Sequence, residues 1–210
     1  MTGPETLRDI VPEYRSGNPA VRWLFWKRVE WAVDMARLGE RPLDILDLGC
    51  GEGALLKALA ASRPGHRLQG MDRHPGVAGL KIAGASIRQG DLTEPGALPA
   101  GAFDRVFCLD VLEHVEALEG PLGAIREALR PGGLLVLTAP TENVFHKTCR
   151  FILKGTFSEA EGPAAGRHYH KADTLARDVS SAGLELLDAR SLPLPGPLAL
   201  IRVMSFLRRP

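Results

Sequence analysis

The residues with the clearest chemical meaning lie in the stretch ILDLGCGEG, at positions 45 to 53. Gly49, Gly51 and Gly53 follow an apolar run, and Asp47 comes two residues before the first of them. Glycine lets a ligand approach the main chain without meeting a Cβ atom, and a helix that starts after the loop points its free N–H groups at the same place. The pattern predicts a binding loop for a nucleotide-like cofactor.

Two classes of cofactor compete for this loop. The run GCGEGA satisfies the fingerprint of dinucleotide-binding proteins with Ala54 in the third small position, and Asp72 follows at the spacing of a ribose-binding acid. A carboxylate at Asp47 would repel a pyrophosphate, whereas it suits a cofactor that carries an ammonium and a sulfonium group. S-adenosylmethionine is such a cofactor, so Asp47 favours it over NAD.

At this point the chain resembles the class I S-adenosylmethionine-dependent methyltransferases, whose first motif alternates three glycines after an acid as Asp47 to Gly53 do. The resemblance implies that the loop residues Gly49, Cys50 and Gly51 contact the cofactor. It implies that Asp72 accepts both ribose hydroxyls, which suits a carboxylate with two acceptor oxygens.

The later cofactor contacts come from the same resemblance. Asp91 and Leu92, in RQGDL, match the pair that contacts the adenine, and Arg73 is placed to lie over that ring. The run FDRVFCLDVLEHV and the PGG at 131 to 133 resemble the branch that contains the ubiquinone-pathway O-methyltransferases. There Leu109 would contact the methionine part of the cofactor, and Arg22, in NPAVR, would face its carboxylate.

The elements that must position these residues alternate between short apolar runs and helical stretches. This alternation predicts βαβ units and a parallel sheet covered on both faces. With the resemblance, we expect an α/β, doubly wound, mostly parallel seven-stranded Rossmann-like sheet with an antiparallel last strand. We expect one domain over 1–210, divided into an N-terminal helical segment (1–40), a cofactor-binding half (41–140), a small helical cap (141–170), and a C-terminal helix with strands (171–210).

Two histidines are candidates for catalysis. His114, in LEHV, follows a predicted strand at the edge where such sheets bind ligands, and a neutral imidazole can take a proton from a hydroxyl. The alternative is a histidine that caps or orients a helix. His168, in GRHYH, is the second candidate because the resemblance places a histidine near the acceptor in this region, while a polar loop explains it equally.

A metal set is also present in the sequence. Asp110, Glu113 and His114 have the spacing i, i+3, i+4, which puts them on one face of a helix, and some ubiquinone-pathway relatives use such a set for magnesium. Magnesium prefers oxygen ligands and the short Asp110 reaches less far, so we expect no metal here and interpret the set as a solvent-facing acidic turn.

Two amphipathic segments bear on the acceptor and on location. The stretch 144–154 (VFHKTCRFILK) separates apolar and basic residues at helical spacing, and Trp23, Trp26 and Trp31 lie in the first predicted helix beside basic residues. These segments either touch a membrane surface, which suits a lipid-like acceptor, or pack over the site with their charges in water.

Composition restricts the function classes. The 26 Lys and Arg nearly balance the 25 Asp and Glu, which argues against nucleic acid as a partner. Three cysteines without a CxxC pair and the lack of a long apolar run predict a cytoplasmic protein, with peripheral membrane contact as the alternative.

Together these features predict an S-adenosylmethionine-dependent methyltransferase that methylates oxygen on a small or lipid-like molecule. The alternatives are a non-catalytic cofactor-binding relative that acts as a partner or sensor and, less favoured, an NAD-type oxidoreductase. The sequence does not indicate an oligomeric state.

Overall fold

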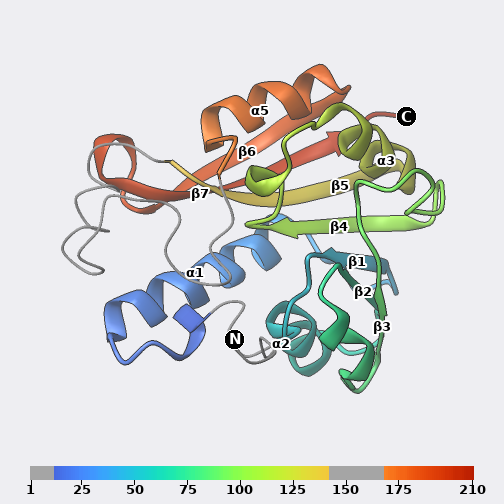
Figure 1. Cartoon of the computed structure of the whole chain (residues 1–210), viewed down its shortest axis with the longest axis horizontal. Coiled ribbons are helices and arrows are strands. Elements are labelled where there is room, and N and C mark those ends of the chain that lie inside the picture. Colours follow the sequence, from blue (N-terminus) through green and yellow to red (C-terminus); the bar gives the residue numbers. More distant parts are fainter. Residues whose placement is uncertain (1–11, 142–167) are drawn as a thin grey trace, which may run out of the picture.

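The computed structural model describes residues 12–141 and 168–210, and its centre is a seven-stranded sheet (Figure 1). The strand order is β3-β2-β1-β4-β5-β7-β6, and β7 runs antiparallel to both of its neighbours. The other neighbouring strands pair in parallel. The predicted sheet, with its antiparallel last strand, is confirmed. The strands are β1 (Asp44–Leu48), β2 (Arg67–Asp72), β3 (Ala85–Gln89), β4 (Phe103–Leu109), β5 (Leu129–Pro140), β6 (Leu184–Pro193) and β7 (Ala199–Arg208).

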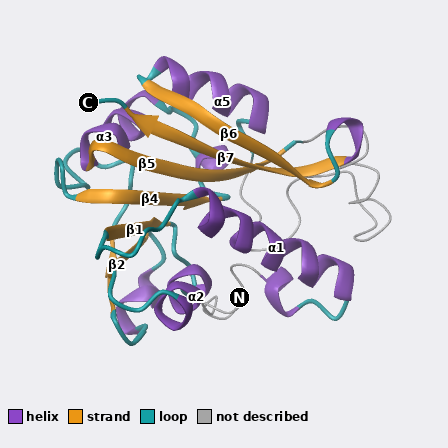
Figure 2. Ribbon diagram, turned by 180° about the vertical axis from the view of Figure 1, so that it is seen from behind, coloured by secondary structure: helices purple, strands orange, loops and turns teal. Residues whose placement is uncertain are grey.

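The helices cover both faces of the sheet (Figure 2). Their sequences favour helix, as in the Ala- and Leu-rich run ALLKALAAS, and the side chain of Asn18 caps the first of them by accepting from the Ala20 amide at 2.9 Å. The described α-helices are α1 (Pro19–Met35), α2 (Ala54–Ser62), α3 (Glu119–Ala128) and α5 (Ala172–Ser181). Short 3₁₀ turns are η2 (Pro12–Arg15), η3 (Pro75–Gly79), η4 (Leu112–His114) and η5 (Gly196–Leu198).

The core consists of two apolar layers, one on each face of the sheet. All five residues of β1 are buried, and their side chains alternate between the layers: Leu46 and Leu48 pack in the layer of α3 and α5, whereas Ile45 packs in that of α1 and α2. A central strand buried on both faces explains the continuous apolar run that precedes the glycine loop.

Ion pairs link the first residues of β1 and β4 to arginines at the amino-terminal edge of the sheet. Arg130 Nη1 lies 2.7 Å from a carboxylate oxygen of Asp44 and 2.8 Å from one of Asp104, and Arg67 adds a second pair to Asp44. The hydrogen bond from Arg67 is the largest cause that lowers the pKa of Asp44 to about 2. These charges are paired with one another and stabilise the fold. We therefore expect the functional groups at the opposite edge, at the carboxyl ends of the strands.

The connection between the neighbouring strands β2 and β3 lacks an α-helix, and one part of the chain falls outside the described residues. The run from Pro75 to Gly84 forms the single turn η3 and a bridge between Ile82 and Ala85, because its three glycines disfavour a longer helix. Most of the predicted cap at 141–170, with the basic stretch 144–154, lies outside the described residues. No helix within 12–141 and 168–210 is long and apolar enough to cross a membrane.

Candidate cofactor and acceptor site

The loop between β1 and α2 has a backbone that only glycine adopts easily. Gly49 and Gly53 have φ angles of +70° and +76°, in the left-handed region. A Cβ atom built on Gly49 would lie 2.2 Å from Cγ2 of Val111, and one built on Gly53 would lie 2.2 Å from Cδ1 of Ile82. Both glycines are therefore required by backbone geometry and by the packing of the neighbouring loops.

This loop forms the floor of a pocket at the carboxyl ends of β1 and β4. Five residues predicted to contact the cofactor line it: Asp47, Gly49, Cys50, Gly51 and Leu109. The pocket also contains Tyr14 and Arg28, which come from the N-terminal segment and α1. The structure thus brings the first motif and the end of β4 together, as the sequence predicts.

The electrostatics of the pocket centre on Asp47, which is 3% exposed. Burial, and secondarily the neighbouring carboxylate of Asp72, raise the pKa of Asp47 to about 8, while Arg28 opposes the shift. A buried carboxylate in this position favours a cationic ligand, because a positive charge would lower its pKa again.

Arg28 is a pocket residue that the sequence analysis missed. It is 2% exposed, forms an ion pair with Asp110, donates to the Tyr14 hydroxyl at 2.6 Å, and lies over the Phe25 ring at 4.8 Å. Arg22, which was predicted to face the cofactor carboxylate, is exposed on α1 and donates to the Ser16 carbonyl at 2.7 Å.

A signal for Arg28 exists in the sequence. It precedes Ala32 by four residues and Met35 by seven, and both of these are buried on α1. An arginine on the apolar stripe of a helix must find a buried partner, and that requirement points to a site.

The remaining predicted cofactor residues follow β2 and β3. Asp72, at the end of β2, accepts from the Gly51 amide and from the His74 amide, both at 2.8 Å, and a carboxylate retains further acceptor positions. Asp91 accepts hydrogen bonds from the backbone amide and the hydroxyl of Thr93. The hydrogen bond from the amide is the largest cause that holds the pKa of Asp91 below its usual range.

The positions of Asp72 and Asp91 are compatible with the predicted contacts with ribose and adenine. Leu92 is buried and Arg73 is exposed. The contacts of all four residues with the cofactor remain predictions.

The turn after β4 differs from the helix that would put the candidate metal set on one face. Asp110 has a φ of +54°, unusual for a residue with a side chain, and its carboxylate accepts from the Thr138 hydroxyl at 2.5 Å and pairs with Arg28. Only the 3₁₀ turn η4 follows. Asp110, Glu113 and His114 therefore do not form one helical face, and Asp110 pairs with the pocket residue Arg28 instead. The interpretation as a solvent-facing acidic turn is also wrong, because Glu113 is 1% exposed.

A different group of side chains meets beside this turn. Glu113, His114 and His168 each place one potential ligand atom within 4.8 Å of the others, and the two imidazole ring centroids lie 4.7 Å apart. The Tyr169 amide donates to the Glu113 carbonyl at 2.7 Å, which ties the segment before α5 to η4. The structure thus joins the two predicted catalytic histidines, which are 54 positions apart in sequence (168 minus 114).

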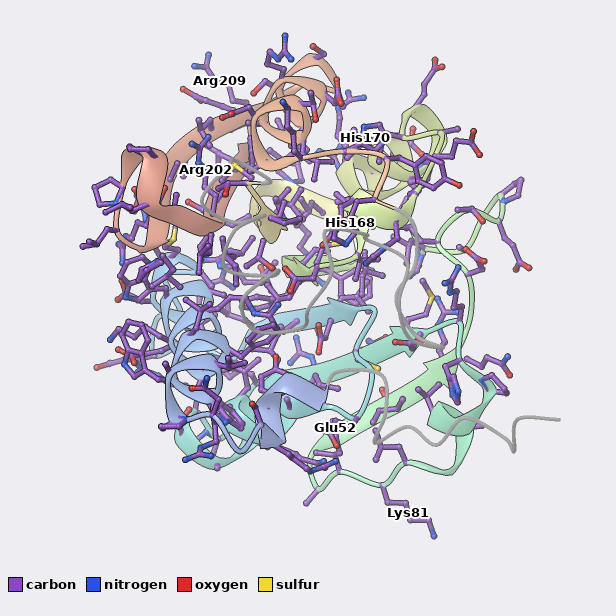
Figure 3. The ribbon with its side chains drawn as sticks, turned by 60° about the vertical axis from the view of Figure 1, so that its left-hand side comes forward. Glu52, Lys81, His168, His170, Arg202 and Arg209 are labelled. Atoms are coloured by element: carbon purple, nitrogen blue, oxygen red, sulfur yellow. The ribbon has the colours of Figure 1, made fainter. Side chains whose placement is uncertain are left out.

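His168 and its neighbour His170 lie in different parts of the molecule (Figure 3). His168 lies over the middle of the molecule, whereas His170 lies farther out, beside α3 and α5. Consistent with this, a ring nitrogen of His170 lies 3.3 Å from the Glu116 carbonyl and the other 3.9 Å from an Asp178 carboxylate oxygen in α5.

The sheet order, the glycine loop and the acids Asp47 and Asp72 at the carboxyl ends of β1 and β2 define a class I methyltransferase architecture. The methyltransferase domain family matches residues 25–189, and the chain belongs to it. The protein is therefore an S-adenosylmethionine-dependent methyltransferase, and its pocket suits the cationic methionine end of that cofactor.

Individual relatives agree with this assignment. The chain is 31% identical over 170 residues to the ubiquinone biosynthesis O-methyltransferase of Aromatoleum aromaticum, which covers 75% of this chain and 70% of that protein. The corresponding enzyme of Acinetobacter baylyi is 29% identical over 177 residues, or 79% and 72% of the two chains.

Solved structures share the fold at lower identity. The N-methyltransferase NodS from Bradyrhizobium japonicum, in complex with S-adenosyl-L-homocysteine, has a TM-score of 0.67 at 20% identity, covering 96% of this chain and 94% of its own. A putative methyltransferase in complex with the Haloferax volcanii activator Trm112 has a TM-score of 0.66 at 16% identity over 98% of each chain. At these identities the likeness concerns the fold alone.

Proposed function

We propose that the protein transfers the methyl group to an oxygen atom of a small or lipid-like acceptor. The observation that carries the proposal is the pair of imidazoles, His114 and His168, that meets at the turn after β4, the strand whose last residue, Leu109, lines the cofactor pocket. A hydroxyl acceptor starts protonated, and a neutral imidazole is a suitable base at neutral pH. The relatives from Acinetobacter baylyi and Aromatoleum aromaticum are ubiquinone biosynthesis O-methyltransferases, which supports oxygen as the acceptor atom.

The pocket residues hold the cofactor in this proposal. Bound S-adenosylmethionine supplies a methyl carbon that its sulfonium makes electrophilic. Asp47 faces the cationic methionine end, and Asp72 accepts from the ribose hydroxyls. Arg28 receives the carboxylate, because its guanidinium is buried in the pocket wall and its Nε has no hydrogen-bond partner among the described residues.

The imidazoles act on the acceptor. One nitrogen of His114 or His168 accepts the hydroxyl proton as the oxygen becomes nucleophilic, and the second imidazole orients the first or passes the proton on. The remaining rate acceleration comes from holding the acceptor oxygen in line with the methyl carbon, because methyl transfer needs no covalent enzyme intermediate.

Exposed apolar side chains support a lipid-like acceptor. Trp23 and Trp26 on α1 are 52% and 43% exposed, and Leu194 and Leu198 are exposed in the turn between β6 and β7. The first half of α1 and that turn extend to the same end of the molecule in Figures 1 and 2. Trp31, by contrast, packs against the core layer of α1 and α2. Aromatic side chains at a protein surface favour a membrane interface, so we include peripheral membrane contact in the proposal.

Turnover with matched acceptors tests the choice of oxygen. Aromatic acceptors that differ only in a hydroxyl or an amino group, each with and without an alkyl tail, are incubated with the full chain, and methylated product is measured by mass spectrometry. We expect the tailed hydroxyl compound to be methylated fastest. Methylation of the amino compound alone would refute the proposal, and tight cofactor binding without any product would indicate a non-catalytic relative.

Variants test the imidazoles. His114→Ala and His168→Ala should each lower kcat by about 10²-fold or more, the usual contribution of a general base, with affinity for S-adenosylhomocysteine within about twofold of wild type. His170→Ala is the control and should keep wild-type turnover. Unchanged kcat in both variants would remove the imidazoles from the reaction.

Co-sedimentation with anionic liposomes tests the membrane contact. Replacing Trp23 and Trp26 with serine should reduce the bound fraction, whereas Leu186→Ser, an equally exposed apolar residue on β6, should not. Equal loss in both variants, or no binding by the wild type, would argue against the α1 surface.

A further inference from the structure

We propose that Glu113, His114 and His168 form a binding site for a divalent transition-metal ion such as Zn²⁺, and not for Mg²⁺. The three residues come from η4 and from the segment before α5, and each offers one ligand atom within 4.8 Å of the other two. Donor atoms around an ion with bonds of about 2.1 Å lie about 3–4 Å apart, so small side-chain rotations would close the set.

The backbone already holds these residues in place. The hydrogen bond of 2.7 Å from the Tyr169 amide to the Glu113 carbonyl fixes the residue after His168 against η4. Glu113 is 1% exposed, and both histidines are half-buried. A buried carboxylate beside two imidazoles provides a carboxylate oxygen and two nitrogen donors at one point, which is the environment that a divalent cation needs.

The chemistry of the donors selects the metal. Mg²⁺ prefers an octahedral shell of oxygen ligands, whereas two imidazole nitrogens and one carboxylate suit Zn²⁺, Fe²⁺ or Co²⁺. The oxygen-rich alternative would require Asp110, but that carboxylate is engaged by Arg28 and by the Thr138 hydroxyl. The structure thus groups two residues of the candidate magnesium set with a histidine from a distant part of the chain in place of Asp110.

Three protein ligands leave a position for a further oxygen ligand, as in catalytic zinc sites. An acceptor hydroxyl in that position would be oriented and made more acidic by the ion. With the ion bound, the two imidazoles act as ligands and the hydroxyl proton passes to solvent; without it, they are free to act as the base. This role rests on the proposed O-methylation, whereas metal binding itself does not.

Metal titrations of the full chain test the site. Protein without a histidine tag is treated with a chelator, and Zn²⁺ and Mg²⁺ binding are followed by calorimetry. Co²⁺ binding is followed by its visible absorption bands. We expect one Zn²⁺ per chain, a Co²⁺ spectrum with nitrogen and oxygen ligands that Zn²⁺ displaces, and binding of Mg²⁺ at least about tenfold weaker. Absence of Zn²⁺ binding, or equal affinity for Mg²⁺, would overturn the proposal.

Variants locate the ion. His168→Ala and Glu113→Gln should weaken Zn²⁺ binding by at least about tenfold, since even residues that only support metal ligands have effects of this size. His170→Ala removes a histidine two positions away, and Asp110→Asn removes the acid of the alternative set; both should retain wild-type Zn²⁺ affinity. Loss of binding in either control, with binding kept in His168→Ala, would place the ion elsewhere.

Affinity for S-adenosylhomocysteine is measured on every variant and separates misfolding from loss of the site. If Glu113→Gln binds neither S-adenosylhomocysteine nor Zn²⁺, that variant is misfolded. His168→Ala then tests the site, because the His168 side chain is only half-buried and its loss should leave the fold intact. Wild-type protein that binds Zn²⁺ but methylates no hydroxyl would refute the proposed function alone. Product formation without Zn²⁺ binding would refute this inference alone.

Discussion

The buried carboxylate of Asp47 makes the stability of the protein depend on pH in a direction that can be measured. Its pKa rises from the ordinary value of 3.8 to about 8 in the folded protein, chiefly through burial. Because the pKa is higher in the folded than in the unfolded state, folding favours the protonated form. This stabilisation is complete below pH 3.8 and is lost as the pH rises towards 8.

The size of the effect follows from the shift. Between pH 5 and pH 7 the unfolded chain is ionised at this position and the folded protein is not, so the free energy of unfolding falls by about 1.4 kcal/mol per pH unit. Asp47 alone should therefore remove about 3 kcal/mol over this range. Asp47→Asn keeps the shape of the side chain and removes its titration.

Urea unfolding of wild type and Asp47→Asn at pH 5, 6 and 7 isolates this term, because the other titrating groups are common to both proteins. The wild type should lose about 3 kcal/mol more than the variant between pH 5 and pH 7. Parallel curves would show that Asp47 has an ordinary pKa in the folded protein and would refute the argument from burial.

The same reasoning predicts that the ligand displaces a proton. The ammonium group of S-adenosylhomocysteine should favour the ionised form of Asp47, so binding near pH 7 should release close to one proton. Calorimetry in two buffers of different ionisation enthalpy measures that proton, and Asp47→Asn should abolish the difference. Equal apparent enthalpies for the wild type in both buffers would separate Asp47 from the cationic end of the ligand.

Three further predictions concern the cofactor pocket and are read out by calorimetry with S-adenosylhomocysteine. Asp72→Ala should weaken binding by about 1–3 kcal/mol, because it removes the acceptor of two hydroxyls; unchanged affinity would exclude it from the ribose site. Arg28→Gln should weaken binding by at least about tenfold and Arg22→Gln should not, and the opposite ranking would favour Arg22 as the carboxylate ligand. Gly49→Ala should lower both the affinity and the melting temperature. Gly132 has a φ of +79° but open space around it, so Gly132→Ala should lower the melting temperature less, through backbone strain alone. Equal effects would mean that the contact with Val111 is relieved by a small shift.

The sequence by itself determined the sheet and the loop. Strands with side chains buried on both faces must be apolar throughout, and the left-handed turns of the loop between β1 and α2 require glycine, so both leave local signals. The resemblance pointed to Asp47, Asp72 and Leu109, and parallel strands bring their carboxyl ends, where these residues lie, to one edge of the sheet.

Tertiary structure alone decided the contacts between distant segments. The sequence favoured Arg22 because a local motif surrounds it, but the packing of α1 on the sheet buries Arg28 instead and pairs it with Asp110. That pair, with the left-handed backbone of Asp110, separates this acid from Glu113 and His114, the other members of the candidate metal set. His168 reaches His114 because a backbone hydrogen bond ties the segment before α5 to η4, and no periodicity in the sequence encodes that contact.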